Sequence, residues 1–164
     1  WLRASTGLSH QPDVWGTLYA LHLGVLRGEA RSAARKTIAA AVRQGSISLD
    51  GAVRHVPTNC DFSATTSWER SLSPVNTYQN GAYWNTPSGW LVEALWTEDR
   101  ALALQVFEQM MAHLRTQDFR KGPGHGAPWE AFGPGGQARQ NPVYLASVAL
   151  PYSVVERLPI VKSP

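Results

Sequence analysis

The chain has 164 residues, of which 43% are hydrophobic, so it can bury a core and wholesale disorder is excluded. Its formal net charge is only +3 and it contains no long run of Lys or Arg, which argues against nucleic-acid binding. Charged residues make up 16%, well below the roughly 25% of a typical soluble domain. Seven tryptophans and many neutral polar side chains make up the difference, a composition that suits a neutral, polyhydroxylated ligand.

Cysteine content and targeting signals narrow the possibilities further. Cys60 is the single cysteine, which excludes an internal disulfide and a multi-cysteine zinc site. No apolar run approaches the roughly 20 residues of a membrane span, and no signal peptide is present, so we expect no membrane partner. These signals do not indicate a cellular compartment. Because the chain begins at Trp1 in the middle of a pattern, we expect a processed product or a fragment.

The first two predicted helices differ in the distribution of their apolar residues. Residues 12–26 follow a helix-start signal at Pro12 and are apolar around most of the circumference, which predicts a buried helix. Residues 30–44 alternate small apolar residues with a basic side, which predicts an amphipathic helix on the outside of the fold, ended by Gly45.

A short hairpin and a long loop follow. In residues 47–54, Asp50-Gly51 separates two short alternating segments, which predicts a small β-hairpin. Residues 57–79 are polar and predict a loop.

The remaining chain repeats the pattern of a buried helix followed by an outer one. Residues 83–96 predict a second buried helix and residues 100–117 a second amphipathic one. After a Gly/Pro-rich loop over 118–139, residues 142–158 predict a third buried helix, which Pro151 would kink or interrupt.

This order predicts an all-α fold in which buried helices lie inside and amphipathic helices outside. We treat residues 1–164 as a single domain. Two and a half helical hairpins form an open arc rather than a closed ring. We therefore expect the flanks of the inner helices to be exposed unless more chain or a partner protein covers them.

The starts of the three buried helices resemble one another. Each combines a side-chain amide with an aromatic residue a few positions on, as in His10-Gln11-Pro12-Asp13-Val14-Trp15, Tyr78-Gln79-Asn80-Gly81-Ala82-Tyr83-Trp84 and Gln140-Asn141-Pro142-Val143-Tyr144. If the inner helices run parallel, these starts converge into a pocket of amides, rings and helix N-termini. Such a pocket suits a sugar, whose ring stacks on aromatic faces. The alternative is that the amides cap helices and the aromatic rings fill the core.

Three of these motifs carry a family resemblance. Gln11-Pro12-Asp13-Val14-Trp15-Gly16-Thr17, Tyr78-Gln79-Asn80-Gly81-Ala82-Tyr83-Trp84 and Pro128-Trp129-Glu130 before a Gly-rich turn resemble the C-terminal part of six-hairpin glycosidases. These are (α/α)6 toroids of the glycogen-debranching, processing-glucosidase and glucoamylase type. The resemblance covers most of residues 9–158. It implies that this chain is the C-terminal part of a larger, twelve-helix toroid whose first half or more is missing.

Glu130 is the first candidate for a catalytic carboxylate. Glycoside hydrolysis normally uses two carboxyl groups, one as acid on the leaving oxygen and one to activate water or attack the anomeric carbon. Glu130 follows Trp129 in a Gly-rich loop, the kind of segment that often carries function. The resemblance implies that this Glu is the general base of an inverting hydrolysis. Ala131 and Phe132 depart from the Tyr-Asn that the family usually has there. The alternative is a solvated loop carboxylate.

Asp13 is the second candidate, because it begins an inner helix beside Trp15 and could bind hydroxyl groups or act as an acid. The alternative is a helix-start charge favoured by the dipole. The resemblance implies that the general acid comes from an earlier part of the toroid. Glu93 lies in an apolar helix, so we expect its carboxylate to be paired in the core or at an interface. Asp61 and Glu69 lie on a possible lid loop and stay unranked.

The sequence therefore predicts a glycosidase that needs no cofactor or metal, since no metal-ligand spacing is present. His125, between glycines, is either a site residue or solvated. The expected partner is a neutral oligosaccharide. We expect sugar subsites at Gln11, Trp15, Tyr78, Gln79, Asn80, Tyr83, Trp84, Trp129 and Tyr144. The main alternative is a non-catalytic carbohydrate-binding or scaffold segment, which needs the aromatic faces but no pair of carboxyl groups. In a third possibility, a helical interaction fragment, the three helix starts would diverge.

Overall fold

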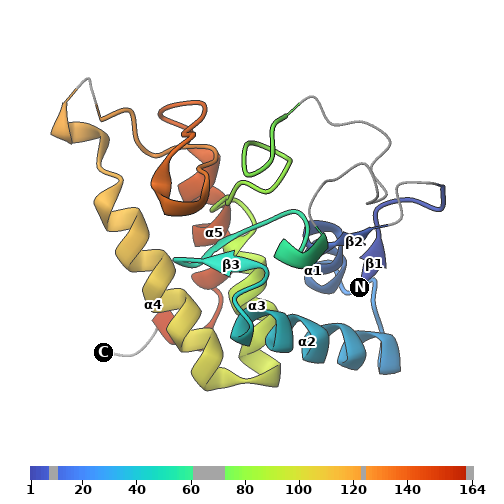
Figure 1. The fold of residues 1–164 in the computed structure, drawn as a ribbon. Coiled ribbons are helices and arrows are strands. Elements are labelled where there is room, and N and C mark those ends of the chain that lie inside the picture. Colours follow the sequence, from blue (N-terminus) through green and yellow to red (C-terminus); the bar gives the residue numbers. More distant parts are fainter. Residues whose placement is uncertain (8–10, 61–72, 123–124, 162–164) are drawn as a thin grey trace.

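The computed structural model describes residues 1–7, 11–60, 73–122 and 125–161, which form a mainly α-helical fold (Figure 1). The described residues contain five α-helices: α1 (Val14–His22), α2 (Gly28–Arg43), α3 (Ser88–Glu98), α4 (Arg100–Thr116) and α5 (Ala146–Val155). They also contain four short 3-10 turns: η1 (Thr58–Cys60), η2 (Phe119–Lys121), η3 (Pro134–Gly136) and η4 (Pro159–Val161). The five predicted helices are thus confirmed, with shifted ends.

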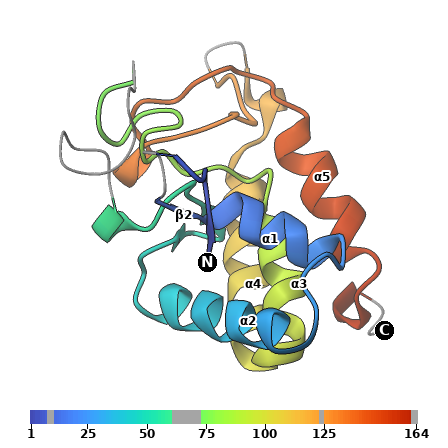
Figure 2. The ribbon, with the colours of Figure 1, turned by 90° about the vertical axis from the view of Figure 1, so that its right-hand side faces the viewer.

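Helix α3 lies at the centre of the fold, because it packs against α1, α2, α4 and α5 (Figure 2). Its side chains Leu91, Val92 and Leu95 are fully buried in the main hydrophobic core. A helix that is apolar all round is stable in water only when neighbours cover every side of it. The predicted buried character of this segment is confirmed.

The two predicted outer helices bury one face each. Ala34 and Ile38 of α2, and Val106 and Met110 of α4, point into the same core. The basic side chains of α2 stay at the surface or only partly buried, as the amphipathic pattern predicts.

Of the inner helices, α3 and α5 run in the same general direction, whereas α1 crosses α3 at a steep angle (Figure 2). Trp15, in the first turn of α1, contacts Trp84 just before α3, and His22 at the end of α1 bonds to Glu93 further along α3. In Figures 1 and 2, α3 and α5 both run from top to bottom, and α4, which lies between them in the sequence, runs from bottom to top. The segments that precede these helices therefore lie at one end of the fold.

The predicted hairpin is present as β3 (Ser48–Leu49) and β4 (Ala52–Val53), which pair antiparallel. Both turn residues, Asp50 and Gly51, have positive φ angles, of 51° and 76°. This is the left-handed conformation that a two-residue hairpin turn requires and that Asp-Gly adopts easily. Gly51 also lies against the backbone of α4, where a Cβ atom would approach the nitrogen of Met110 to 2.5 Å.

Short strand pairings form a second structural feature that the sequence analysis did not predict. β1 (Leu2–Arg3) pairs with β2 (Pro12–Asp13), so Pro12 lies in a strand rather than in the first turn of a helix. Single bridges extend the hairpin across the end of the bundle, from Val53 to Trp84, from Tyr83 to Phe132 and from Ala131 to Gln140. We call this row of pairings the bridge ladder.

The bridge ladder corrects the predicted helix starts. Helix α3 begins at Ser88 instead of residue 83, because the backbones of Tyr83 and Trp84 bond to Phe132 and Val53. Helix α5 begins at Ala146 instead of residue 142, because the N–H of Tyr144 bonds to the carbonyl of Pro128. Pro151 lies inside α5 without interrupting it.

Candidate functional site

The bridge ladder positions Glu130. Its backbone N–H donates to the carbonyls of Gln140 (3.1 Å) and Asn141 (3.2 Å), and its neighbour Ala131 accepts from the N–H of Gln140. The loop is also tied to the start of α5, where the Ser147 hydroxyl donates to the carbonyl of Trp129 at 2.8 Å. Glu130 is therefore held on an ordered segment, and only 6% of its surface is exposed.

Three polar side chains surround the Glu130 carboxylate. Asn141 donates a hydrogen bond to it from Nδ2. Partial burial, the negative charge of Glu130 and a hydrogen bond to Glu130 each raise the pKa of Tyr144. The pKa of Tyr78 is raised by the same causes and by Tyr144. Both phenols thus stay protonated at neutral pH, so they can donate to a carboxylate.

Aromatic contacts join this carboxylate to the other predicted segments. The Tyr78 ring lies 5.0 Å from that of Trp84, and the Trp84 ring lies edge-on to that of Trp15 at 5.1 Å. Trp84 also packs with Ala131 in one small hydrophobic cluster. The three predicted segments therefore meet. The first contributes Trp15, the second contributes Tyr78 and Trp84, and the third contributes Asn141 and Tyr144. We call these five residues together with Glu130 the aromatic–carboxylate cluster.

His55 belongs beside this cluster, although the sequence analysis did not single it out. Its ring stacks on that of Trp15, with the centroids 3.9 Å apart, and meets Trp84 edge-on at 5.6 Å. Burial lowers the pKa of His55 to about 4, so the ring is neutral at physiological pH. The only local signal is its position just after the hairpin, because a lone histidine belongs to no motif.

Several polar atoms in this region lack a partner in the described part of the chain. They are buried and belong to predicted ligand-binding residues: Gln11 Oε1, Trp15 Nε1, Asn80 Oδ1 and Trp84 Nε1. Buried polar groups in proteins are nearly always hydrogen-bonded to protein, water or a ligand. Two indole N–H donors and two amide oxygens are therefore available to hydroxyl groups or to water.

Asp13 caps a helix. Its Oδ1 accepts from the N–H of Gly16 at 2.8 Å, and its backbone carbonyl accepts from the Thr17 hydroxyl at 2.6 Å. This is the ordinary role of an Asp at the N-cap, and it matches the helix-start alternative for this residue. One carboxylate oxygen is thus engaged in holding α1.

Two other predicted residues have different surroundings from the cluster. Tyr83 points to the opposite side of its segment from Trp84, where it is 5% exposed and packs with Ala52 and Phe132. Alternation of sides is expected for consecutive residues in extended backbone. Gln79 is exposed, whereas Asn80 is buried and donates from Nδ2 to the carbonyl of Ser73.

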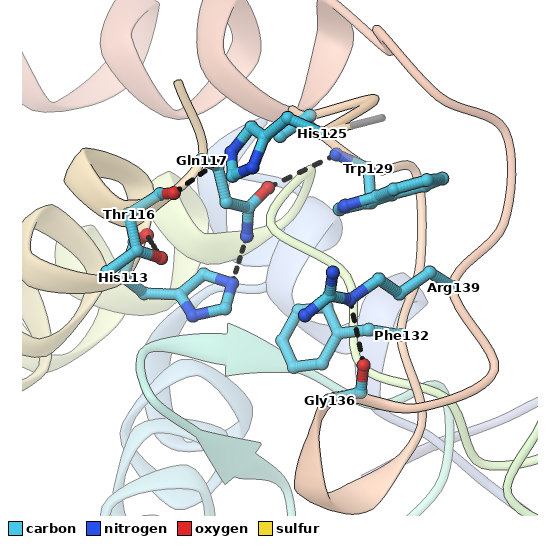
Figure 3. Close-up of a pocket in the computed structure, with 9 residues that line it drawn as sticks. His113, Thr116, Gln117, His125, Trp129, Phe132, Gly136 and Arg139 are labelled. Atoms are coloured by element: carbon cyan, nitrogen blue, oxygen red, sulfur yellow. Dashed lines mark hydrogen bonds between the residues drawn. The ribbon is translucent and has the colours of Figure 1, made fainter. Parts of the chain in front are cut away.

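Trp129 lines a separate cavity of about 70 Å³ on the side of α4 (Figure 3). In that view Gln117 lies between Trp129 and His113, and its Oε1 accepts from the Trp129 backbone N–H at 3.1 Å. The Arg139 guanidinium lies 5.8 Å from the Trp129 ring. Since one water occupies about 30 Å³ in the liquid, this space suits a few waters rather than a sugar ring.

The remaining candidates lie away from the cluster or outside the described residues. Glu93 is paired, as predicted, with Nδ1 of His22 at 2.7 Å. His125 bonds to the carbonyl of Thr116 at 3.1 Å. Asp61 and Glu69 fall outside the described residues.

Among the described residues, no group of three or more His, Cys, Asp and Glu side chains could hold a metal ion. None of the helices in the described part of the chain is long and apolar enough to cross a membrane.

Comparison of the chain with protein-family models, with curated proteins and with solved structures found no match. The proposals below therefore rest on the residues and their arrangement.

Proposed function

We propose that this protein is a glycoside hydrolase that acts on a neutral oligosaccharide by inversion, with Glu130 as the general base. The single observation that carries the proposal is the aromatic–carboxylate cluster. A carboxylate held by Asn141 and two tyrosines lies beside tryptophans whose indole N–H groups are unpartnered in the described part of the chain. Rings that stack on a pyranose and donors that bond its hydroxyls are what a sugar requires.

The proposed reaction gives each group a defined task. Glu130 accepts a proton from a water molecule as the water oxygen attacks the anomeric carbon and the glycosidic bond breaks. A second carboxyl group gives its proton to the leaving oxygen, which departs as an alcohol. Tyr78, Asn141 and Tyr144 hold the Glu130 carboxylate in one orientation, so that less rearrangement is needed during the reaction.

The identity of the acid follows from the same proposal. Asp13 engages one carboxylate oxygen in capping α1, so its side chain is less free to approach a leaving oxygen. We therefore favour an acid supplied by chain that precedes this segment in a larger (α/α)6 toroid. The exposed apolar side chains of α1 and α5 are compatible with such an arrangement.

A specific observation favours a second candidate, a carbohydrate-binding segment without catalysis. Glu130 is 6% exposed, and Asn141 and two tyrosines already bond to its carboxylate. In that case Glu130 accepts hydrogen bonds only, and the unpartnered groups of Gln11, Trp15 and Trp84 bind the sugar.

The test measures hydrolysis and binding of a panel of α- and β-linked oligosaccharides. The variants are Glu130→Gln, which keeps the shape and removes the charge, and Trp15→Phe. A hydrolase loses at least a hundredfold in turnover with Glu130→Gln while substrate binding changes little. Trp15→Phe raises the dissociation constant because it removes an indole donor and ring area.

The control is Glu108→Gln, which removes a carboxylate from the exposed face of α4. Circular dichroism establishes that each variant folds. Binding without hydrolysis in the wild-type chain supports the second candidate. Neither binding nor hydrolysis of any member of the panel would reject both.

A further inference from the structure

A second cavity lies at the other end of the inner helices, and it differs in chemistry from the aromatic–carboxylate cluster. It occupies about 250 Å³ between α1, α2 and α3, and Leu158 also lines it. Its polar lining comes from Arg31 and Arg35 of α2, His22 of α1 and Glu93 of α3. The volume falls just below the roughly 300 Å³ at which pockets for drug-sized ligands begin, so it suits a small ion or metabolite.

The two arginines lie one helical turn apart. Positions i and i+4 share a helix face, where like charges destabilise the helix slightly. Burial, followed by the charge of Arg31, lowers the pKa of Arg35, while Glu98 and Glu93 act in the opposite direction. The charge of Arg31 thus disfavours the charged form of Arg35, in addition to burial.

The guanidinium of Arg35 also includes a buried donor atom. Its Nε atom is buried, and within the described part of the chain it has no acceptor. Neither Arg31 nor Arg35 forms an ion pair with an acidic side chain of the described residues. An uncompensated donor of this kind costs stability unless a ligand or water satisfies it.

The acidic residue of the cavity is already engaged. Glu93 accepts a hydrogen bond from Nδ1 of His22 at 2.7 Å. Two arginines and one carboxylate give the lining a formal charge of +1 when the histidine is not counted. Paired guanidinium groups match the geometry of phosphate and carboxylate oxygens better than that of a simple halide.

We propose that this cavity binds a small oxyanion, a phosphate or carboxylate group, between the guanidinium groups of Arg31 and Arg35. The anion accepts from the buried Nε of Arg35 and relieves the repulsion between the two charges. The site is independent of the proposed hydrolase activity, because the cavity shares no residue with the aromatic–carboxylate cluster.

Calorimetric titration tests the proposal with inorganic phosphate in one arm and citrate in the other, with sodium chloride added to hold the ionic strength constant. We expect saturable binding of at least one of them. The variant Arg31→Gln changes an exposed residue and is therefore expected to fold. It should weaken the binding at least tenfold, and Arg35→Gln should weaken it by as much or more.

Lys36→Gln is the matched control, because it also removes one positive charge from an exposed position of α2 but does not line the cavity. It should change the dissociation constant less than twofold. The proposal is overturned if neither anion binds saturably. It is also overturned if Lys36→Gln weakens binding as much as Arg31→Gln, since the overall charge of +3 would then explain the attraction.

Discussion

Helices α3 and α5 are similarly rich in apolar residues, yet their side chains are buried to different extents. In α3, Leu91, Val92 and Leu95 are fully buried. In and beside α5, the side chains of Leu145 and Tyr152 are 72% and 60% exposed. The difference comes from the neighbours, since α3 packs against four helices whereas α5 packs chiefly against α3. Apolar composition thus shows that a helix can be buried, and the number of helices around it decides whether it is.

The largest expected effect is a difference in unfolding free energy between a variant of a buried leucine in α3 and a variant of an exposed leucine beside α5. Leu95→Ala removes a fully buried side chain from the middle of α3, and we expect it to lower the free energy of unfolding by about 3 kcal/mol. Leu145→Ala changes a 72% exposed position, and we expect less than about 0.5 kcal/mol. Urea unfolding followed by circular dichroism measures both. Equal losses would mean that α5 is covered in solution by another chain or copy.

The dependence of stability on pH tests the part of the molecule outside α5, because α5 contains no His, Asp or Glu. The pKa of His55 is lowered from 6.5 to about 4 in the folded protein. As the pH falls from 6.5 to 4, the unfolded chain therefore binds a proton that the folded chain excludes, and stability decreases. From about 1.4 kcal/mol for each pKa unit, the loss reaches roughly 3 kcal/mol near pH 4.

His55→Phe keeps a ring against Trp15 and should flatten this decrease. The decrease does not vanish, because burial lowers the pKa of His113 as well and acts in the same direction. His125→Gln serves as the control. An unchanged pH profile in His55→Phe would show that His55 is solvated when the protein is folded.

The contact between α3 and α5 depends on the absence of a side chain at Gly89. A Cβ atom there would approach the carbonyl oxygen of Pro151 to 2.8 Å and its Cα to 2.9 Å. Backbone atoms cannot swing aside, so Gly89→Ala should push α5 away and cost about 2 kcal/mol of unfolding free energy. Gly7→Ala has only a 3.7 Å contact with a side-chain oxygen and should be neutral. Thermal unfolding of both variants distinguishes them.

The smallest expected effect concerns how the helices begin. Asp13 caps α1 through its side chain, whereas Leu145, the N-cap residue of α5, forms no side-chain cap. Asp13→Ala should therefore cost about 1 kcal/mol, and Asp13→Asn, which can still accept the hydrogen bond, only a few tenths. If Asp13→Asn instead abolished hydrolysis at unchanged stability, Asp13 would be an acid of the reaction as well as a cap.

The local patterns of the sequence predicted much of the fold. Helical periodicity located all five helices, and Asp50-Gly51 located the hairpin, because these signals depend on residues close together in the chain. The outer faces of α2 and α4 followed from their amphipathic spacing. The meeting of the segments of Trp15, Trp84 and Tyr144 was expected from three similar helix starts, although only Trp15 lies in a helix.

The bridge ladder could not be predicted in the same way. Its pairings join single residues such as Tyr83 and Phe132, 49 positions apart, and a bridge of one residue leaves no alternating pattern. For this reason the predicted start of α3 was wrong, and Tyr83 and Trp84 were expected on one helix when they lie on opposite sides of an extended segment. His55 was missed because its stacking on Trp15 depends on the same distant pairings.

The sequence by itself determined which segments are helical and which faces of α2 and α4 are buried, because backbone propensity and apolar spacing act over one or two turns. Only the tertiary structure decided that α3 is surrounded, that α5 is exposed, and that Glu130 is bonded by Asn141 and two tyrosines. Those outcomes depend on contacts between residues far apart in the chain, and it is the packing of all the helices together that selects them.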